Sequence, residues 1–189
     1  MTTDEFGHDL EHVEVLQRKF DEFQKDMASQ EYRVTEVNEQ ADKLVTDSHP
    51  DRETVQRRKD ELNEAWMKLK QLALLRQEKL FGAHEIQRFN RDADETVAWI
   101  SEKDVVLSSD EYGRDLASVQ TLQRKHEGVE RDLAALEDKV STLGAEASRL
   151  RDIHSEHSEQ IHSKKAEIIA YWTSLTAKAK VRNLMSRVR

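Results

Sequence analysis

The histidines are the residues whose spacing comes nearest to that of a chemical site. Histidine is a common metal ligand, and His154, His157 and His162 are close in the sequence, while His8 and His12 could share one helix face at a spacing of four residues. No clear Asp or Glu third ligand and no HExxH pattern accompanies either group. We therefore expect no physiological metal site.

The other patterns that indicate catalysis or cofactor binding are missing from the sequence. With 0 Cys, a thiolate zinc site and a cysteine nucleophile are excluded. There is also no glycine-rich phosphate loop, no nucleophile elbow and no Asp-x-Asp-x-Asp-Gly calcium loop. Carboxylates are numerous, but nothing predicts a concave site that would perturb their pKa values. We predict that the chain is not an enzyme and binds no cofactor.

The elements that carry these side chains must be mostly helical, because the sequence is poor in turn residues. Its 189 residues include 5 Gly and 1 Pro, too few for the frequent turns of a sandwich, a barrel or a doubly wound sheet. A net charge of -8 disfavours nucleic acid and anionic membrane surfaces as partners. No stretch approaches the roughly 18 apolar residues of a membrane span. The lack of cysteine fits a reducing, intracellular compartment.

The chain contains an internal repeat with an offset of 106 residues. Residues 6–10 (FGHDL) align with 112–116 (YGRDL), and residues 16–19 (LQRK) align with 122–125 (LQRK). The offset is unchanged near the far end, where Trp66 aligns with Trp172. A period this long indicates two copies of a unit that contains several helices.

Within each copy, apolar residues recur at alternating steps of three and four, the heptad pattern of helices that pack as coiled coils. In the second copy the pattern runs through Leu116, Val119, Leu122, His126, Val129, Leu133, Leu136, Val140, Leu143, Ala147 and Leu150. In the first copy it runs through Leu10, Val13, Leu16, Phe20, Phe23, Met27, Gln30, Val34, Val37, Ala41 and Leu44. Only this stripe needs burial, so the 36% of charged residues belong to solvated helix faces rather than to a disordered chain.

Each copy continues into another helix after a polar break. Residues 48–51 (SHPD) end one helix and start the next, because Pro cannot continue a helix but suits its first turn. The complete copy is predicted to have helices at about 84–106, 112–153 and 158–185, with polar residues 108–111 capping the helix that begins near Tyr112. Gly82 costs only about 1 kcal/mol relative to Ala. We therefore expect one continuous helix from about 52 to 106.

A three-helix unit of 106 residues, with Trp99 in its first helix and Trp172 in its third, resembles the spectrin repeat. The most specific stretches are IQRFNRDADE (86–95), AWISEK (98–103), DEYGRDL (110–116) and LQRKHE (122–127), which are most similar to alpha-spectrins of the non-erythroid type. The resemblance implies an all-α fold of tandem three-helix, left-handed coiled-coil bundles joined by a continuous helix.

The resemblance also implies a function and partners. The chain would be a structural segment of a spectrin-type cytoskeletal rod, an elongated flexible spacer in the actin-linked membrane cortex of the cytoplasm. Its partners would be spectrin-family chains, beta-spectrin above all, and the actin network through that complex.

Large side chains on the seams are expected to be structural. The residues assigned to the core are Trp66, Trp99, Trp172, Phe20, His126 and Leu122. A tryptophan on an apolar stripe is far more often core than ligand, and truncating Trp99 or Trp172 to Ala is expected to cost about 3–5 kcal/mol if it is buried. His126 occupies the heptad position of Phe20, so we expect a hydrogen-bonded core or seam-edge histidine.

The repeat predicts two domains, an incomplete repeat at 1–83 with only the second and third helices and a complete repeat at 84–189. The residues between them form an interrepeat linker, Leu80, Phe81, Gly82, Ala83 and His84. The incomplete repeat is expected to expose a helix-accepting seam that includes Val13, Phe20, Val34, Leu62 and Trp66.

Two interpretations of the incomplete repeat stay open. In the first, the N-terminus is an arbitrary boundary and the intact protein supplies the missing helix. In the second, the chain is a protein-binding module whose open helix pair accepts a helix from another chain, with self-association as one form of this.

The C-terminal residues depart from the family pattern. Lys178, Lys180, Arg182, Arg187 and Arg189 are interleaved without a carboxylate. Such a stretch is either a basic amphipathic helix that could bind acidic lipid, calmodulin or an acidic helix, or a frayed end.

Overall fold

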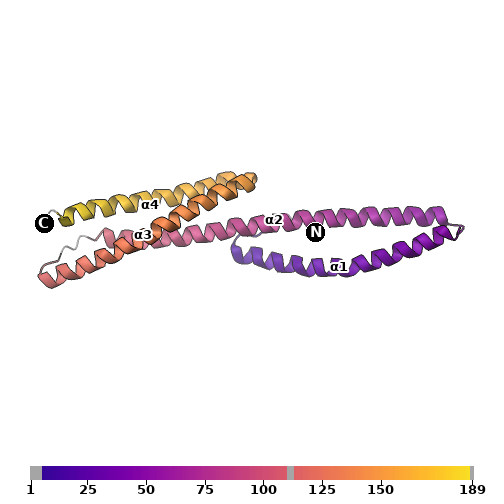
Figure 1. The fold of residues 1–189 in the computed structure, drawn as a ribbon, viewed down its shortest axis with the longest axis horizontal. Coiled ribbons are helices and arrows are strands. Elements are labelled where there is room, and N and C mark those ends of the chain that lie inside the picture. The colour runs from indigo at the N-terminus through magenta and orange to yellow at the C-terminus, as the bar shows by residue number, and fades with distance from the viewer. Residues whose placement is uncertain (1–5, 110–112, 188–189) are drawn as a thin grey trace. The chain divides into compact units, whose positions relative to one another are not determined.

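The computed structural model describes residues 6–109 and 113–187, and these residues are almost entirely helical. In this range the α-helices are α1 (Leu10–Thr46), α2 (Arg52–Leu107), α3 (Leu116–Ile153) and α4 (Ser158–Arg187), which Figure 1 labels. The short 3-10 helix η1 (Ser155–His157) lies between α3 and α4. No strand occurs among the described residues. The predicted all-α fold is confirmed.

Polar side chains set the starts of two helices. The Asp9 carboxylate accepts a hydrogen bond from the backbone N–H of His12 at 2.8 Å and so caps α1. Asp115 caps α3 in the same way, accepting from the backbone N–H of Ser118 at 2.8 Å. The Ser118 hydroxyl in turn accepts from the backbone N–H of Asp115 at 3.1 Å, which completes a capping box.

The start of α3 corrects the sequence prediction. We expected this helix to begin near Tyr112, but it begins at Leu116. Gly113 has a left-handed backbone with φ of 79°, and Asp115 is extended, so neither residue can belong to an α-helix. The residues at 110–112, to which part of the predicted cap was assigned, lie outside the described range.

The predicted continuous helix is confirmed. α2 runs without a break from Arg52 to Leu107, a span of 56 residues, and Gly82 lies inside it. At 1.5 Å per residue its length is about 84 Å. The turn before it follows the predicted break, since α1 ends at Thr46 and Pro50 lies just ahead of Arg52.

The chain divides into two compact units, Met1–His84 and Glu85–Arg189, here called the first and the second unit. In the first unit, α1 lies antiparallel to the first part of α2 (Figure 1). The buried residues of its apolar cluster are Phe20, Ala73 and Leu80. On the solvated edge of this helix pair, Lys59 of α2 pairs with Asp42 of α1.

A paired amide also joins the two helices of the first unit. Asn38 of α1 and Asn63 of α2 exchange hydrogen bonds, with nitrogen–oxygen distances of 2.8 and 3.1 Å. Both side-chain amides are partly buried, so each compensates the desolvation of the other. This pair fixes the alignment of the two helices along their seam.

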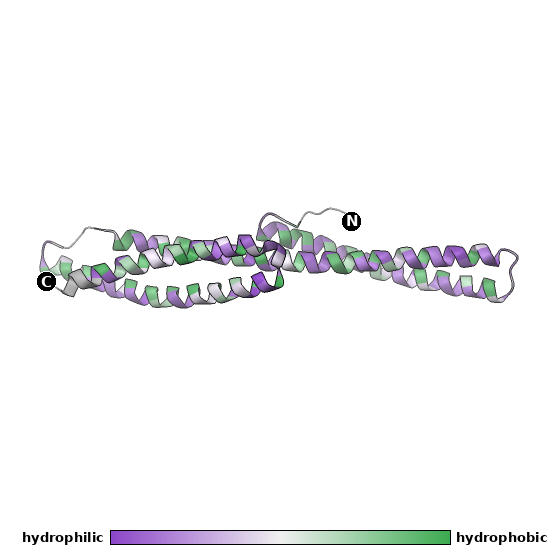
Figure 2. Ribbon diagram, turned by 90° about the horizontal axis from the view of Figure 1, so that it is seen from above, coloured by the Kyte–Doolittle hydropathy of each residue, from purple (hydrophilic) through white to green (hydrophobic). Residues whose placement is uncertain are grey.

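The second unit is a three-helix bundle formed by the rest of α2, α3 and α4. One apolar cluster contains Ile86, Phe89, Ala93, Leu143, Ala147, Leu150, Ile161 and Ile168. The other contains Ile100, Leu107, Val129, Leu136 and Leu175. Each cluster draws residues from all three helices, while hydrophilic residues alternate with the apolar ones along every helix (Figure 2).

Candidate functional site

The candidate site is an apolar face of the first unit whose counterpart in the second unit is covered. The face, called here the open face, consists of Val37 and Leu44 on α1 and of Val55, Leu62 and Leu69 on α2. The residues 106 positions later are Leu143, Leu150, Ile161, Ile168 and Leu175, and all five are buried. On the open face, by contrast, Val37 and Leu44 are 47% and 41% exposed and the other three are half-buried.

The covering element in the second unit is the latter part of α2. Ile86, Phe89 and Ala93 of this helix share one cluster with Leu143 and Leu150 of α3. Ile100 and Leu107 extend the contact into the second cluster. A matching helix over the open face would therefore bury side chains that stand partly in solvent, at roughly 25 cal/mol per Å² of apolar surface.

Two residues of the predicted helix-accepting seam are buried and three are half-buried. Val13 is 0% exposed and Phe20 is 6% exposed, so neither contributes to an exposed stripe in this structure. Val34, Leu62 and Trp66 are half-buried. Val37 and Leu44 are more exposed than these residues and lie on the predicted heptad stripe, but they are outside the predicted seam. Their alignment with Leu143 and Leu150 was the signal that could have identified them.

Ion pairs join α2 to both neighbouring helices in the second unit. Lys103 pairs with Asp132 on α3 at 2.8 Å, and this hydrogen bond raises the pKa of Lys103 against the opposing effect of burial. Asp94 pairs with Lys164 on α4, whose pKa is raised for the same reason. The ionised forms of these groups are therefore favoured in the folded unit.

A second charged cluster lies at the other end of this bundle. Arg149 donates to Glu85 at 2.8 Å and to Glu146 at 2.7 Å. The second Glu85 oxygen lies 3.0 Å from Nε2 of His154, and since a carboxylate only accepts, Nε2–H is the donor. Partial burial acts to raise the pKa of Glu85, but the hydrogen bonds from His154 and Arg149 outweigh it, so the pKa is below its ordinary value. The hydrogen bond from Arg149 likewise lowers the pKa of Glu146.

Four of the predicted core residues are half-buried. Trp99 and Trp172 are half-buried and pack against the cluster around Ile100. Trp66 is half-buried in the first unit, with the Lys70 ammonium nitrogen 5.9 Å from its ring centroid. Leu122 is also half-buried.

His126 and Phe20 occupy equivalent heptad positions with different results. Phe20 is buried in the apolar cluster of the first unit. His126 is half-buried, and its Nε2 atom is enclosed without a hydrogen-bond partner among the described residues. The nearest carboxylate oxygen, from Glu130, lies 3.6 Å from this nitrogen. His126 is thus a half-buried histidine at the seam, and its Nε2 atom makes no hydrogen bond with the described residues.

All five predicted linker residues lie inside α2. Leu80 is 2% exposed and belongs to the cluster of the first unit, whereas Phe81 is 60% exposed. Gly82 is buried, and Ala83 and His84 are half-buried. His84 Nε2 lies 3.7 Å from a Glu14 oxygen on α1.

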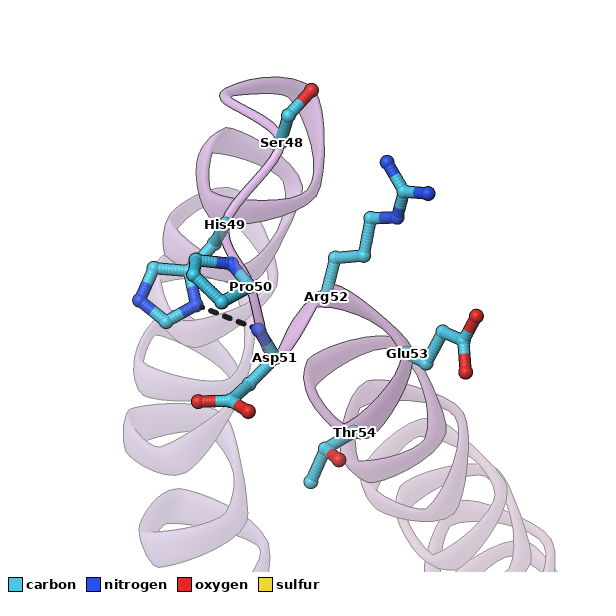
Figure 3. Close-up of a pocket in the computed structure, with 7 residues that line it drawn as sticks. All are labelled: Ser48, His49, Pro50, Asp51, Arg52, Glu53 and Thr54. Atoms are coloured by element: carbon cyan, nitrogen blue, oxygen red, sulfur yellow. Dashed lines mark hydrogen bonds between the residues drawn. The ribbon is translucent and has the colours of Figure 1, made fainter.

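The turn between α1 and α2 forms a shallow hollow lined by seven consecutive residues (Figure 3). They are Ser48, His49, Pro50, Asp51, Arg52, Glu53 and Thr54. The His49 Nδ1 atom accepts a hydrogen bond from the backbone N–H of Asp51 at 3.2 Å, so the ring supports the turn. All seven residues are exposed. The hollow therefore lacks the buried polar groups that a catalytic site requires.

Histidine spacing produces contact but no chelating group in the described part of the chain. The rings of His8 and His12 lie with centroids 5.6 Å apart, although His8 precedes the start of α1 and the two do not share a helix face. Within residues 6–109 and 113–187, however, no three His, Asp or Glu side chains are arranged to hold a metal ion. None of the helices described is long and apolar enough to cross a membrane.

Some of the basic C-terminal residues are engaged within the second unit. Lys178 donates to Asp104 at 2.7 Å, and Arg182 donates to the carbonyl oxygens of Leu107 and Ser109, both at 2.7 Å. These contacts secure α4 to the end of α2. The side chain of Arg187 and all of Arg189 lie outside what the structure describes.

Comparison with known proteins gives consistent matches along the chain. The model of the spectrin repeat family matches residues 1–81 and 84–184. The mouse protein "Spectrin alpha chain, erythrocytic 1" is 38% identical over 179 residues, which is 95% of this chain and 7% of that protein. The Drosophila melanogaster "Spectrin beta chain" is 36% identical over 178 residues, 94% of this chain and 8% of its own length.

A third relative is also a spectrin chain. The mouse "Spectrin beta chain, erythrocytic" is 34% identical over 167 residues, 88% of this chain and 8% of that protein. The chain thus spans less than a tenth of the length of each of these relatives.

Proposed function

Because the chain belongs to the spectrin repeat family, we propose that it is a structural segment of a spectrin-type cytoskeletal rod and acts as an elongated, flexible spacer. The observation that carries this proposal is α2, a single helix from Arg52 to Leu107 that contributes to both units. Because both units share this helix, bending or unfolding of one unit would affect the other. The family is a structural one, and we propose no catalytic role.

The division into repeats belongs to the same proposal. We assign residues 1–83 to an incomplete repeat with the second and third helices and residues 84–189 to a complete one. The compact units divide between His84 and Glu85, and the two family matches are 1–81 and 84–184. Residues Leu80 to His84 would then control bending.

The proposed partners and location are those of a spectrin-type rod, and the relatives support the partners. These relatives are spectrin alpha and beta chains, and so the proposed partners are spectrin-family chains, in particular beta-spectrin. Through that complex the segment would be linked to the actin network at the cytoplasmic cell cortex. Retention of purified beta-spectrin by the immobilised chain would identify a docking segment, whereas a plain spacer retains none.

Replacing Ala83 by Pro tests the spacer proposal. Pro removes a helical hydrogen bond and clashes with the preceding turn, at a cost of about 3 kcal/mol or more. If α2 couples the two units, thermal unfolding of the Ala83→Pro chain should separate into two transitions. Ala83→Gly is the matched control, because it keeps the backbone N–H and costs only about 1 kcal/mol. A single transition, unchanged by Ala83→Pro, would contradict the coupling.

A second candidate function is favoured by one observation, the exposure of the open face. The helix pair of the first unit would act as a binding module that accepts a helix from another chain. Val37 and Leu44 are exposed where Leu143 and Leu150 are buried, so an added helix has apolar surface to cover. Light scattering over a concentration series tests the self-association form, which a strict monomer at high micromolar concentration would exclude.

A further inference from the structure

The part of α2 that belongs to the first unit carries three large, exposed apolar residues in one row. Met67, Leu74 and Phe81 are 62%, 62% and 60% exposed. They are seven residues apart, close to two helical turns, so they lie on one face of α2. This row is called here the outer stripe. Apolar residues scattered singly over a surface need no explanation, but a continuous row of three does.

The second unit shows that the fold does not need apolar residues at these positions. The counterparts of Met67 and Leu74, 106 positions later, are Thr173 and Lys180. Both are exposed, and the second unit forms its three-helix bundle with these polar residues in place. The packing of the helices therefore does not account for Met67 and Leu74.

The outer stripe points away from the side on which a third helix packs in the second unit. There, Lys178 of α4 meets Asp104 of α2 at 2.7 Å, so this side of α4 faces α2. Lys180 follows two residues later and is turned by about 200° around the helix axis. Leu74 occupies the equivalent place on its own helix. The exposure of Leu74 thus does not depend on what packs against the opposite side of the pair.

Carboxylates border the outer stripe along α2. Glu64 lies three residues before Met67. Glu78 lies four residues after Leu74 and three before Phe81. Residues three or four apart are neighbours on a helix surface, and both carboxylates are exposed. The stripe is therefore acidic along one edge.

Further carboxylates border the stripe from α1. Three contacts between the helices share one antiparallel register, in which the two residue numbers add to 101; they are Asn38–Asn63, Glu31–Lys70 and Asp42–Lys59. In this register Asp21 lies level with Leu80, beside Phe81. Glu14, seven residues earlier on the same face of α1, has an oxygen 3.7 Å from Nε2 of His84. Both carboxylates are exposed, so the second edge is acidic as well.

The net charge of the first unit has the same sign as this border. Residues 1–84 contain 19 Asp and Glu against 13 Lys and Arg, a net charge of -6 out of -8 for the chain. Lys70, which lies beside the stripe, is already paired with Glu31. The charge around the outer stripe therefore complements a cationic partner.

From these observations we propose that the outer stripe binds a basic amphipathic helix of a separate protein. The apolar face of that helix covers Met67, Leu74 and Phe81, and basic residues on its two flanks meet the carboxylates on α2 and α1. The stripe is about 21 Å long at 1.5 Å per residue, so about four turns of the partner span it. Two copies of this stripe would bring like charges together, which disfavours a second copy of the chain as the occupant.

The inference adds a docking surface to the proposed spacer and does not rest on the open face. The experiment uses the full chain and a labelled helical peptide of about 21 residues, with leucine on one face, lysine on both flanks and alanine elsewhere. Fluorescence anisotropy follows its binding. We expect saturable binding that weakens as salt is added, and much weaker binding of a peptide that has glutamate in place of every lysine.

Substitution of Leu74 tests the position of the surface. Leu74→Lys removes an apolar contact and repels the basic flanks, so it should weaken binding about tenfold or more. Leu74→Gln, which adds no charge, should weaken it severalfold. The matched control is Leu75→Lys, because Leu75 is 48% exposed and lies about 100° around the helix from Leu74. Circular dichroism verifies that each variant keeps its helical content, as the tolerated Lys180 of the second unit predicts.

Neutralising Glu78 tests the charge of the border. Glu78→Gln should weaken binding of the lysine peptide about twofold at low salt and have no effect at high salt, because an exposed ion pair is weak and readily screened. Glu22→Gln makes the same change at an exposed residue of α1, about 100° around that helix from Asp21. This control should leave the affinity unchanged.

Each contrary outcome overturns the inference in a different way. If Leu74→Lys has no larger effect than Leu75→Lys, the peptide does not bind the outer stripe. If Leu44→Lys abolishes binding and Leu74→Lys does not, the peptide occupies the open face instead. Equal binding of the glutamate peptide would show that the partner is not basic, and absence of binding would show that the surface accepts no such helix. A dimer of the chain that Leu74→Lys dissociates would place a second copy on the stripe.

Discussion

The first and second units contain the same helix pair, yet one exposes a face that the other buries. In the second unit, the latter part of α2 covers Leu143 and Leu150, while Val37 and Leu44 at the equivalent positions of the first unit stand in solvent. The side chains are alike in type and in heptad position. The difference teaches that burial at these two positions depends on the third helix and not on the stripe alone.

The largest test of this comparison is the truncation of equivalent leucines. Leu150 is 0% exposed and packs in a closed cluster, so Leu150→Ala should destabilise the chain by about 2–5 kcal/mol through lost contacts and a cavity. Leu44→Ala, at an exposed position, should cost less than about 1 kcal/mol. Urea denaturation of both variants provides the measurement. Equal losses would show that the open face is covered in solution.

Two glycines at equivalent positions, Gly7 before α1 and Gly113 before α3, provide the next comparison of the units. Gly7 and Gly113 both have positive φ, which costs about 1–2 kcal/mol for other residues. A Cβ at Gly7 would lie 2.6 Å from a methyl group of Val13, which is 0% exposed and cannot move aside. At Gly113 it would lie 2.9 Å from Val119, which is 37% exposed.

Gly7→Ala should therefore destabilise the chain by more than Gly113→Ala, with the strain of about 1–2 kcal/mol common to both. The midpoint of thermal unfolding, read separately for each variant, measures the difference. If Gly113→Ala were the more harmful change, the difference in burial between Val13 and Val119 would not be the controlling factor.

The charged cluster around Glu85 should make the stability of the second unit depend on pH. Glu85→Gln removes a charge from the hydrogen bonds of Arg149 and His154, and a loss of about 1.5 kcal/mol is expected at neutral pH. The positions equivalent to Arg149 and His154 in the first unit are Lys43 and Ser48. The Lys43→Gln control should change stability by a few tenths of a kcal/mol, about the amount of an ordinary surface substitution.

The direction of the pH effect follows from the lowered pKa of Glu85. A carboxyl whose pKa falls on folding stabilises the protein above its unfolded pKa, ordinarily 4.5, and loses this contribution as the pH falls through the folded value. The stability difference between the unmodified chain and Glu85→Gln should thus stay constant above about pH 5 and shrink in acid. A difference that grew on acidification would contradict this assignment of the pKa direction.

The smallest expected effect concerns the edge pair that both units share. Lys59→Ala breaks the pair with Asp42 and should cost less than about 1 kcal/mol, since Asp42 is exposed. Lys165→Ala, which breaks a hydrogen bond to the Ser148 hydroxyl instead of an ion pair, should respond less to added salt. Denaturant midpoints at low and high salt distinguish the two. If salt shifted the midpoints of both variants equally, the Lys59–Asp42 pair would not differ from the Lys165–Ser148 hydrogen bond in its dependence on charge.

Much of the fold was predictable because the sequence patterns that specify it involve residues close together in the chain. Heptad spacing predicts the helix pairs, residues 48–51 predict the turn between α1 and α2, and the lack of any strong breaker at Gly82 predicts the continuous helix. The start of α3 was predicted four residues early, at Tyr112 instead of Leu116. Gly113 and Asp115 hold non-helical backbone that sequence spacing does not reveal.

The candidate site was only partly predictable, because exposure depends on contacts between distant elements. Val34, Leu62 and Trp66 are half-buried members of the predicted seam, but Val13 and Phe20 proved to be buried. The cluster of Glu85, Arg149 and His154 joins residues more than 60 positions apart and had no local signal.

The sequence by itself determined the helices, the 106-residue repeat and the family, because heptad spacing, breaks and repeated stretches are properties of neighbouring residues. The tertiary structure decided which equivalent positions are buried and which charges meet. Val13 and Val119 are the same residue type in the same loop-and-helix context, yet they are 0% and 37% exposed. Burial is decided by whatever packs over a side chain, and that depends on elements far away in the sequence.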